Sequence, residues 1–267
     1  MKKVVLFDMD GTLTPARKKI EWDMVVSLRE LSKYAEIGIV TGSDLNYLRE
    51  QCSMMWREIN SCNPHKITLL PCNGTKRLTW CKKTKDFITV NTVGMKEEVG
   101  DVVYRKLIEN LIKAQDYFIT YTKPACPLSG TFLSYRGSLL NYCPIGRDAT
   151  DSDREIFCQL DDQNLIRCRL IDRLKAAIPD IIDNFEIRLG GETSIDIFPK
   201  GWNKTYALKY YGNHDVYFVG DRCEAGGNDH DIYLAVKRGN NYKTINTTNT
   251  KEIIGNLIDS FRKEDIK

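Results

Sequence analysis

Two aspartates near the start of the chain, Asp8 and Asp10, have the type and spacing of residues that bind a cation and carry a transferable group. They follow an apolar run at residues 3–7 that predicts a buried strand, and Gly11 predicts a turn directly after them. Side chains two residues apart point to the same side of an extended backbone. The pair therefore suits a hard cation such as Mg²⁺, with one aspartate as nucleophile and the other as general acid/base.

The composition predicts a soluble globular protein. The chain has 267 residues, with 42% hydrophobic and 28% charged residues, enough for one large domain or two small ones. A net charge of +3 is too mild to indicate nucleic-acid binding. No apolar run approaches the roughly 20 residues of a membrane span. Nine cysteines without a C-x-x-C pair, and no apolar signal region at the start, predict reduced thiols and a cytoplasmic protein.

The first and last parts of the chain have the pattern of an α/β core. Buried strands are expected at 37–40, 67–70 and 215–219, with amphipathic helices at 22–34 and about 249–262. The second strand ends at Thr41, and Ser43 is the candidate N-cap of the helix that follows, an arrangement that either only caps the helix or also binds phosphate. We expect a doubly wound parallel sheet formed by residues 1–86 and 201–267.

Residues 87–200 differ in pattern and predict an inserted α+β cap domain. Helices are expected at 97–114, 151–160 and 163–177. Short strand-like segments surround them, at 87–90, 117–121, 131–135, 139–142, 185–189 and 193–198. Consecutive alternating strands backed by helices favour an antiparallel layer over more doubly wound sheet.

Further charged residues could complete a phosphoryl site around the two aspartates. Asp221 follows the strand at 215–219 and, with Asp8 and the backbone carbonyl of Asp10, could hold Mg²⁺. Lys204 is either a solvated lysine or the cation that neutralises a phospho-aspartate. Asn228 and Asp229 either orient the metal ligands or belong to a turn.

Four arginines, Arg17, Arg136, Arg147 and Arg154, are candidates for phosphate contacts. A guanidinium binds phosphate in a bidentate manner and keeps its charge when partly buried. Spacing alone favours the interpretation as ordinary surface arginines.

The motif Asp8-Met9-Asp10-Gly11-Thr12-Leu13-Thr14 resembles the nucleophile motif of the haloacid dehalogenase (HAD) superfamily, which transfers phosphoryl groups through a phospho-aspartate. Beyond that motif, nearly the whole chain resembles the eukaryotic-type phosphomannomutases. The blocks that carry this likeness include Gly130-Thr131-Phe132, Pro144-Ile145-Gly146-Arg147, Ser194-Ile195-Asp196, Gly201-Trp202-Asn203-Lys204 and Gly226-Gly227-Asn228-Asp229-His230.

The resemblance implies Asp8 as nucleophile, Asp10 as acid/base, and Thr41 as a residue that binds the transferring phosphoryl. It implies a hexose phosphate substrate and an activator, glucose or mannose 1,6-bisphosphate, besides Mg²⁺. It further implies a homodimer formed through the cap domain and a role in GDP-mannose synthesis. The sugar-phosphate contacts that it implies are Arg17, Arg136, Arg147, Arg154, Ser194 and Asp196.

The sequence departs from the family pattern at four positions. Asn203 stands where the family usually has Asp, Thr41 replaces a small residue, and Cys72 replaces a Glu. Ala235 replaces an Asp associated with a second cation, which predicts that this second site is absent. We expect a mutase that interconverts mannose 6-phosphate and mannose 1-phosphate. The alternatives are a HAD-type sugar-phosphate phosphatase, which Thr41 and Asn203 leave open, and a catalytically silent sugar-phosphate-binding protein.

Overall fold

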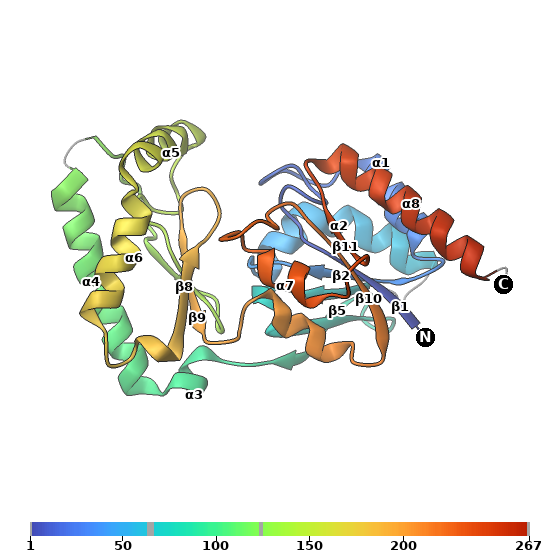
Figure 1. Ribbon diagram of the computed structural model, residues 1–267, viewed down its shortest axis with the longest axis horizontal. Helices are drawn as coiled ribbons and strands as arrows, with labels where there is room; N and C mark the ends of the chain where they lie inside the picture. The colour runs from blue at the N-terminus through green and yellow to red at the C-terminus, as the bar shows by residue number, and fades with distance from the viewer. Residues whose placement is uncertain (1, 63–66, 123–124, 266–267) are drawn as a thin grey trace. The chain divides into compact units, whose positions relative to one another are not determined.

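The computed structural model describes residues 2–62, 67–122 and 125–265 and divides the chain into two compact units (Figure 1). The core unit comprises residues 1–92 and 203–267, and the cap unit comprises residues 93–202. The cap therefore begins later than the expected residue 87, because β5 (Asp86–Thr92) pairs antiparallel with β4 (Lys76–Cys81) and so extends the core sheet.

The core unit contains a seven-stranded sheet in the order β11-β10-β1-β2-β3-β4-β5. The five strands from β11 to β3 are parallel, and β4 and β5 add an antiparallel edge. Of the parallel strands, β1, β2, β3 and the second half of β10 are largely apolar, as expected for strands buried on both faces, whereas β11 at the edge of the sheet has the sequence Asn-Tyr-Lys. Their bounds are β1 Lys2–Phe7, β2 Glu36–Val40, β3 Ile67–Leu70, β10 His214–Gly220 and β11 Asn241–Lys243.

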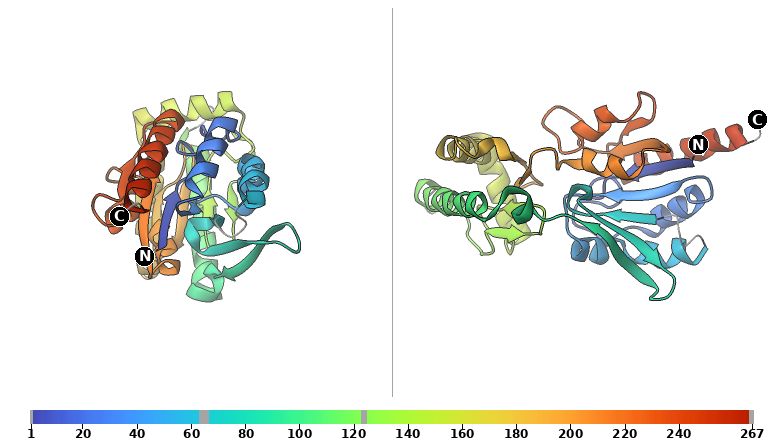
Figure 2. Two further views of the ribbon diagram at one scale, coloured as in Figure 1. Left: turned by 90° about the vertical axis from the view of Figure 1, so that its right-hand side faces the viewer. Right: turned by 90° about the horizontal axis from the view of Figure 1, so that it is seen from below.

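Helices cover both faces of this sheet (Figure 2). On one face α1 (Trp22–Leu31), α2 (Leu45–Cys62) and α8 (Thr247–Asp265) form a hydrophobic core with alternate residues of β1 and β2. On the other face η3 (Lys204–Tyr210) and α7 (His230–Ala235) pack against the remaining apolar residues of β1. The expected doubly wound α/β core is thereby confirmed.

The start of α2 corrects one expectation. Asp44, rather than Ser43, caps this helix, because the Asp44 carboxylate accepts a hydrogen bond of 3.0 Å from the backbone N–H of Tyr47. The Ser43 backbone N–H instead donates to the Thr41 hydroxyl at 3.1 Å. Ser43 thus belongs to the loop that holds Thr41.

We predict that Asp44→Ala lowers the free energy of unfolding by about 1 kcal/mol, the usual cost of losing an N-cap side chain. Urea denaturation would measure the change. Ser43→Ala is the matched control and should alter stability by less than about 0.5 kcal/mol, as surface substitutions usually do. Equal losses of stability in the two variants would contradict the assignment of the N-cap to Asp44 alone.

The cap unit consists of a four-stranded antiparallel sheet in the order β6-β7-β9-β8, with helices on one face. Apolar residues of α4, α5 and α6 pack on alternate residues of the strands and form a separate hydrophobic core. The elements are α3 Met95–Val99, α4 Asp101–Thr122, β6 Leu133–Tyr135, β7 Leu140–Tyr142, α5 Asp151–Asn164, α6 Ile166–Ala177, η2 Ile182–Asn184, β8 Phe185–Leu189 and β9 Ile195–Pro199.

The expected strand at 117–121 is wrong, because these residues continue α4 as a helix. Leu111, Ala114 and Phe118 lie three and four residues apart and are buried in the cap core, so their burial stabilises the helix against the local β preference. The single helix expected at 97–114 also begins earlier. Gly100, at a φ of +80°, separates α3 from α4.

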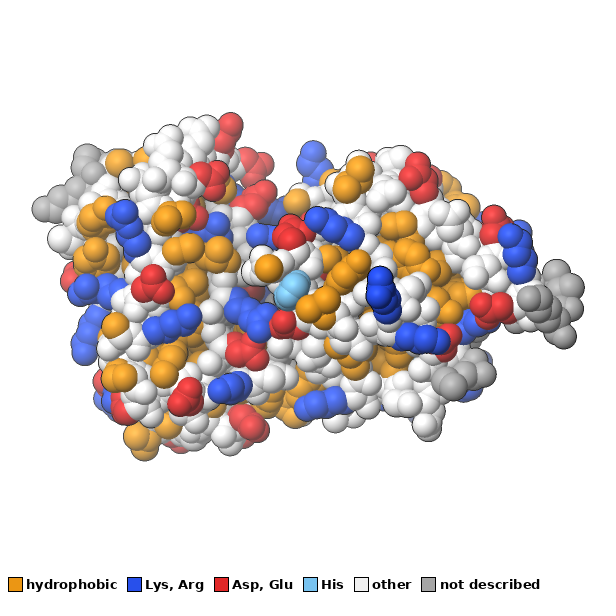
Figure 3. All heavy atoms as spheres, in the orientation of Figure 1, with side chains coloured by type: hydrophobic (Ala, Val, Ile, Leu, Met, Phe, Trp, Pro, Cys, Tyr) orange, Lys and Arg blue, Asp and Glu red, His pale blue; other side chains and the backbone are white. Residues whose placement is uncertain are grey.

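The surface carries mixed charges. On the face drawn in Figure 3, basic and acidic side chains are interspersed over both units and do not gather into one basic patch. None of the eight cysteines whose side chains are described forms a disulfide. Among the described helices, none is long and apolar enough to cross a membrane.

Candidate active site

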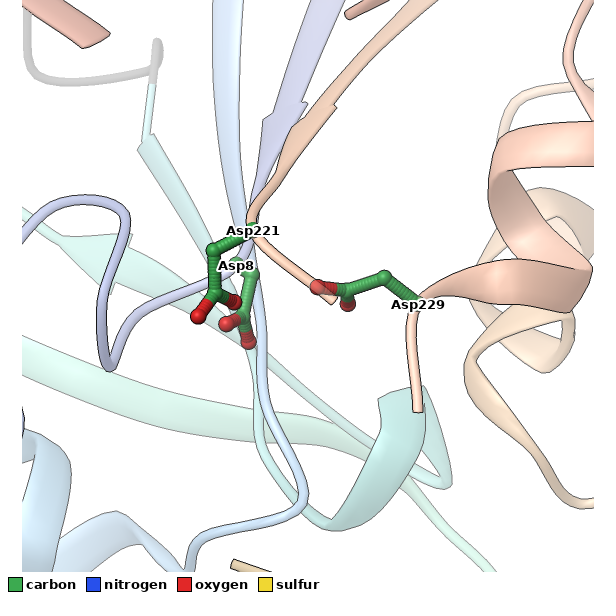
Figure 4. Close-up of side chains that lie close together, drawn as sticks. All are labelled: Asp8, Asp221 and Asp229. Carbon is green, nitrogen blue, oxygen red and sulfur yellow. The ribbon is translucent and has the colours of Figure 1, made fainter. Parts of the chain in front are cut away.

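Three carboxylates of the core unit converge at the carboxyl ends of its central strands (Figure 4). Asp8 directly follows β1 and Asp221 directly follows β10. These strands are parallel neighbours with Phe7 opposite Val219, so the two aspartates emerge side by side. Asp229 is the residue immediately before α7. Each of the three offers an oxygen within 4.8 Å of the others.

Lys204 supplies the positive charge at this cluster. Its side chain is almost fully buried, and its ammonium group lies 2.5 Å from a carboxylate oxygen of Asp8 and 2.5 Å from one of Asp229. Burial alone would lower the pKa of Lys204, but the negative charges of Asp229 and Asp8 outweigh it and raise the pKa above its ordinary value. Lys204 therefore stays charged, and the interpretation as a solvated lysine is wrong.

The cluster as a whole has an excess of negative charge. With its three carboxylates ionised and Lys204 protonated, its net charge is −2, since −3 + 1 = −2. Burial, and then the charge of Asp229, raise the pKa of Asp8 well above its ordinary value and that of Asp221 to about 6. A divalent cation bound here would offset the negative charge and so favour the ionised carboxylates.

The site has the donor atoms that Mg²⁺ requires. One oxygen of Asp221 and the amide oxygen of Asn228 are buried without a hydrogen-bond partner among the described residues. Gly11 leaves room for Asp221, because a Cβ atom at Gly11 would lie 2.4 Å from the Asp221 carboxylate. Hard oxygen ligands with unused lone pairs suit a hard cation such as Mg²⁺ better than a softer metal.

We predict that Mg²⁺ raises the melting temperature more at pH 7.5 than at pH 5. The pKa of Asp221 lies above its ordinary value, so the metal-free native state binds more protons than the unfolded chain. Its free energy of unfolding therefore falls as the pH rises between 3.8 and about 6. Above that window the ionised carboxylate would be ready to bind Mg²⁺, and a cation that binds only the folded protein would stabilise it.

Thermal melting with and without Mg²⁺ at the two pH values would measure this difference. Asp221→Asn should reduce the rise in melting temperature that Mg²⁺ causes and should remove most of the pH dependence of that rise. An equal Mg²⁺-induced shift at both pH values in the unsubstituted protein would contradict the prediction.

Asp10 lies in a different environment from the other aspartates. Its carboxylate lies outside the cluster found among the described residues and accepts a hydrogen bond of 2.9 Å from the backbone N–H of Arg17. Burial raises the pKa of Asp10 above its ordinary value. A carboxyl group held apart from the cluster, with a raised pKa, suits proton transfer better than charge neutralisation.

Thr41 is held by a strained turn. The backbone carbonyl of Thr41 accepts from Asn73 at 2.8 Å, and the Ser43 carbonyl accepts from Cys72 at 3.0 Å. Both donors belong to η1 (Cys72–Gly74), where Cys72, Asn73 and Gly74 have φ values of 51°, 62° and 86°. This turn places the buried Thr41 at the end of β2, next to β1 in the sheet.

Asn203 has a structural partner that explains its departure from the family pattern. Its oxygen caps η3 by accepting from the backbone N–H of Thr205 at 3.0 Å, and its amide nitrogen donates to Asp231 at 2.9 Å. An aspartate at this position would keep the cap but place a second negative charge beside Asp231.

The cap unit brings part of the other expected set together on one face of its sheet. Leu140 and Tyr142 point into the core under the helices, so Asn141 between them lies on the opposite face. Asp196 is directly across from Asn141 on β9. The Asn141 amide donates to Asp196 at 2.6 Å and accepts from Arg147 at 2.7 Å.

The remaining cap candidates lie on other segments of this unit. A Cβ atom at Gly190 would lie 2.5 Å from the Ser194 hydroxyl and 3.2 Å from Asp196, which places Ser194 and Asp196 near each other. Arg154, mostly buried on α5, lies 3.6 Å from Glu192. Arg136 directly follows β6 and donates its backbone N–H to the Leu139 carbonyl.

Sequence reasoning underestimated Asp229 and overlooked Asn141. The Gly-Gly-Asn-Asp block pointed to Asp229 but could not separate a site from a turn. Only the spatial pairing with Lys204 shows that Asp229 belongs to the charged cluster. Asn141 is part of a Leu140-Asn141 pair that also matches the phosphomannomutase pattern, but its residue type alone gave no sign of a role.

A model of the eukaryotic phosphomannomutase family matches residues 24–260. The chain belongs to this family. A phosphomannomutase of Nicotiana benthamiana is 33% identical over 232 residues, 86% of this chain and 84% of the relative. One of Encephalitozoon cuniculi is 32% identical over 269 residues, 99% of this chain and 93% of the relative. The latter alignment therefore extends over almost the entire chain.

Solved structures support the fold of this phosphomannomutase family member. A truncated, IMP-bound IMP-nucleotidase of Plasmodium falciparum has a TM-score of 0.67 at 14% identity, covering 97% of this chain and 68% of that one. A trehalose-6-phosphate phosphatase related protein has a TM-score of 0.53 at 14% identity, covering 98% and 100%. These likenesses confirm the HAD-type fold, and at 14% identity they do not indicate the substrate.

Proposed function

We propose that this protein is an isomerase, a phosphomannomutase that interconverts mannose 6-phosphate and mannose 1-phosphate. The observation that carries the proposal is the buried Lys204 ammonium between Asp8 and Asp229, in a chain of the eukaryotic phosphomannomutase family. A lysine held 2.5 Å from a strand-end aspartate supports that aspartate as a nucleophile whose phosphorylated form needs a counter-charge.

In the proposed mechanism, an Asp8 carboxylate oxygen attacks the phosphorus of a hexose 1,6-bisphosphate. The bond from phosphorus to the sugar oxygen breaks, and Asp10 donates its proton to that oxygen. In the second half, Asp10 accepts a proton from the attacking hydroxyl of the sugar monophosphate, and the phosphoryl group leaves Asp8. Lys204 neutralises the charge on Asp8 in both halves, and Thr41 binds an oxygen of the transferring group.

Mg²⁺, when bound, would supply positive charge to the transferring phosphoryl group. We propose Asp8, Asp221 and the backbone carbonyl of Asp10 as its protein ligands. Asp229 orients Lys204 and accepts the backbone N–H of Arg222 at 3.1 Å, so it supports the site without ligating the cation.

We propose that the sugar phosphate is bound by Arg17 of the core unit and by Arg136, Arg147, Arg154, Ser194 and Asp196 of the cap unit. A homodimer through the cap, a cytoplasmic location and the supply of mannose 1-phosphate for GDP-mannose complete the proposal.

The test combines purified protein, Mg²⁺, mannose 1-phosphate and a catalytic amount of glucose 1,6-bisphosphate. Mannose 6-phosphate and free phosphate are followed together. Mannose 6-phosphate that depends on the bisphosphate, with little free phosphate, is the expected result. Free phosphate as the main product would instead assign a phosphatase, since a tenfold preference between transfer and hydrolysis corresponds to only about 1.4 kcal/mol. Neither product would leave a silent binding protein.

A further inference from the structure

Asn141 occupies a position between two proposed substrate contacts in the cap unit. It is 2% exposed, and its side chain makes two hydrogen bonds with opposite roles. The oxygen accepts from the Arg147 guanidinium at 2.7 Å, and the nitrogen donates to the Asp196 carboxylate at 2.6 Å. A single carboxamide group therefore separates a cation from an anion.

The backbone fixes where this amide lies. Asn141 is the central residue of β7 and is paired in register with Asp196 on β9 and with Ser134 on β6. Its neighbours Leu140 and Tyr142 are each 1% exposed in the cap core, so the strand cannot turn the amide away without exposing them. The two hydrogen bonds then determine which end of the amide faces which charge.

A direct ion pair would be the alternative arrangement of the two charged side chains. Arg147 is half-buried and reaches the sheet from the turn after β7, close enough for both charges to contact the same amide. If the guanidinium bound the carboxylate directly, these two charges would neutralise each other and each would bind a ligand less strongly. The neutral amide contacts one end of each charged group and so keeps the two charges separate.

We propose that Asn141 is a positioning residue that keeps Arg147 and Asp196 apart, so that the guanidinium binds a substrate phosphate and the carboxylate binds sugar hydroxyls. This inference rests on the proposed sugar-phosphate contacts of Arg147 and Asp196. It adds a residue that touches no substrate and acts only through these two.

The test is a double-mutant cycle on the KM for mannose 1-phosphate. Asn141→Asp preserves the size of the side chain but places a carboxylate opposite Asp196. It should raise the KM by about tenfold, with a smaller change in kcat, because binding is impaired more than chemistry. In an Asp196→Asn background, the amide introduced on β9 can donate to the carboxylate introduced on β7. There Asn141→Asp should change the KM by less than about twofold.

A second variant keeps the test independent of folding. Asn141→Ala removes the separating amide without adding charge and should show the same pattern, a large KM increase only when Asp196 is present. Asn110→Asp is the matched control, since Asn110 is also buried in the cap unit and its amide donates within its own helix, to the Lys106 carbonyl at 2.8 Å. This control should leave the KM unchanged. Thermal melting verifies that every variant is folded.

The outcomes separate the inference from the proposed function. If Asn141→Asp and Asn141→Ala raise the KM equally in both backgrounds, or in neither, the positioning role is overturned while the proposed contacts stand. If Arg147→Lys and Asp196→Asn themselves leave the KM unchanged, the proposed contacts are wrong and the inference falls with them. A KM increase confined to the background with Asp196 supports both.

Discussion

Replacing Asp8 by asparagine is expected to lower turnover by about 10⁴-fold or more, because an amide cannot form the covalent phosphoryl intermediate. The fold should survive. Burial and the neighbouring Asp229 already raise the pKa of Asp8, so a neutral side chain of the same shape removes an unfavourable charge as well as one partner of Lys204. The measurement is the bisphosphate-dependent conversion of mannose 1-phosphate, together with thermal melting.

Asp23→Asn is the control for this substitution. Asp23 lies on the exposed side of α1 and forms an ion pair with Lys251, a surface interaction worth little. Its loss should change neither activity nor melting temperature appreciably. Turnover of Asp8→Asn within tenfold of the unsubstituted protein would exclude Asp8 as the nucleophile.

Replacing Lys204 by methionine is expected to affect both stability and activity. Removing one partner of a buried ion pair leaves an uncompensated charge, which costs about 3–5 kcal/mol. Here Asp8 and Asp229 both lose their counter-charge. Loss of the cation beside the developing phospho-aspartate should lower kcat by about 10²- to 10³-fold. Urea denaturation and steady-state kinetics would measure the two effects.

Two further variants distinguish this explanation from a general packing defect. Lys209→Met, on the exposed side of the same η3 segment, should leave both quantities nearly unchanged. The double variant Lys204→Met/Asp229→Asn should recover much of the lost stability, since it removes one unpaired carboxylate. It should recover no activity. A double variant as unstable as Lys204→Met would show that shape, and not charge, dominates at this position.

The central strands could be predicted from the sequence because parallel buried strands are short apolar runs that end in polar residues or glycine. Phe7-Asp8 and Gly220-Asp221 are examples, and they also located two of the three clustered carboxylates. By contrast, β4 carries Lys76 and Arg77 and has no strong alternation, so its pairing with β3 and β5 was not expected. The prediction of a strand at 117–121 is wrong because burial of Phe118 in the cap core overrides the local preference for a strand.

The pairings within the site depend on residues that are far apart in the chain. Lys204 is 196 residues from Asp8 and 25 from Asp229, and no local pattern specifies that the three meet. The same holds for Asn141 and Asp196, which strand register alone places opposite each other across 55 residues. A sequence indicates which side chains can do chemistry, whereas their partners follow from the topology.

The separate hydrophobic cores of the two units have a consequence for cooperativity. The buried apolar residues of the cap core all come from positions 95–197, and those of the two core-unit clusters come from positions 4–87 and 207–261. Because each hydrophobic core is formed by residues of one unit, substitutions in the two units should change the free energy of unfolding additively. Heat-induced unfolding should then depart from a single two-state transition, with the calorimetric enthalpy exceeding the van't Hoff enthalpy.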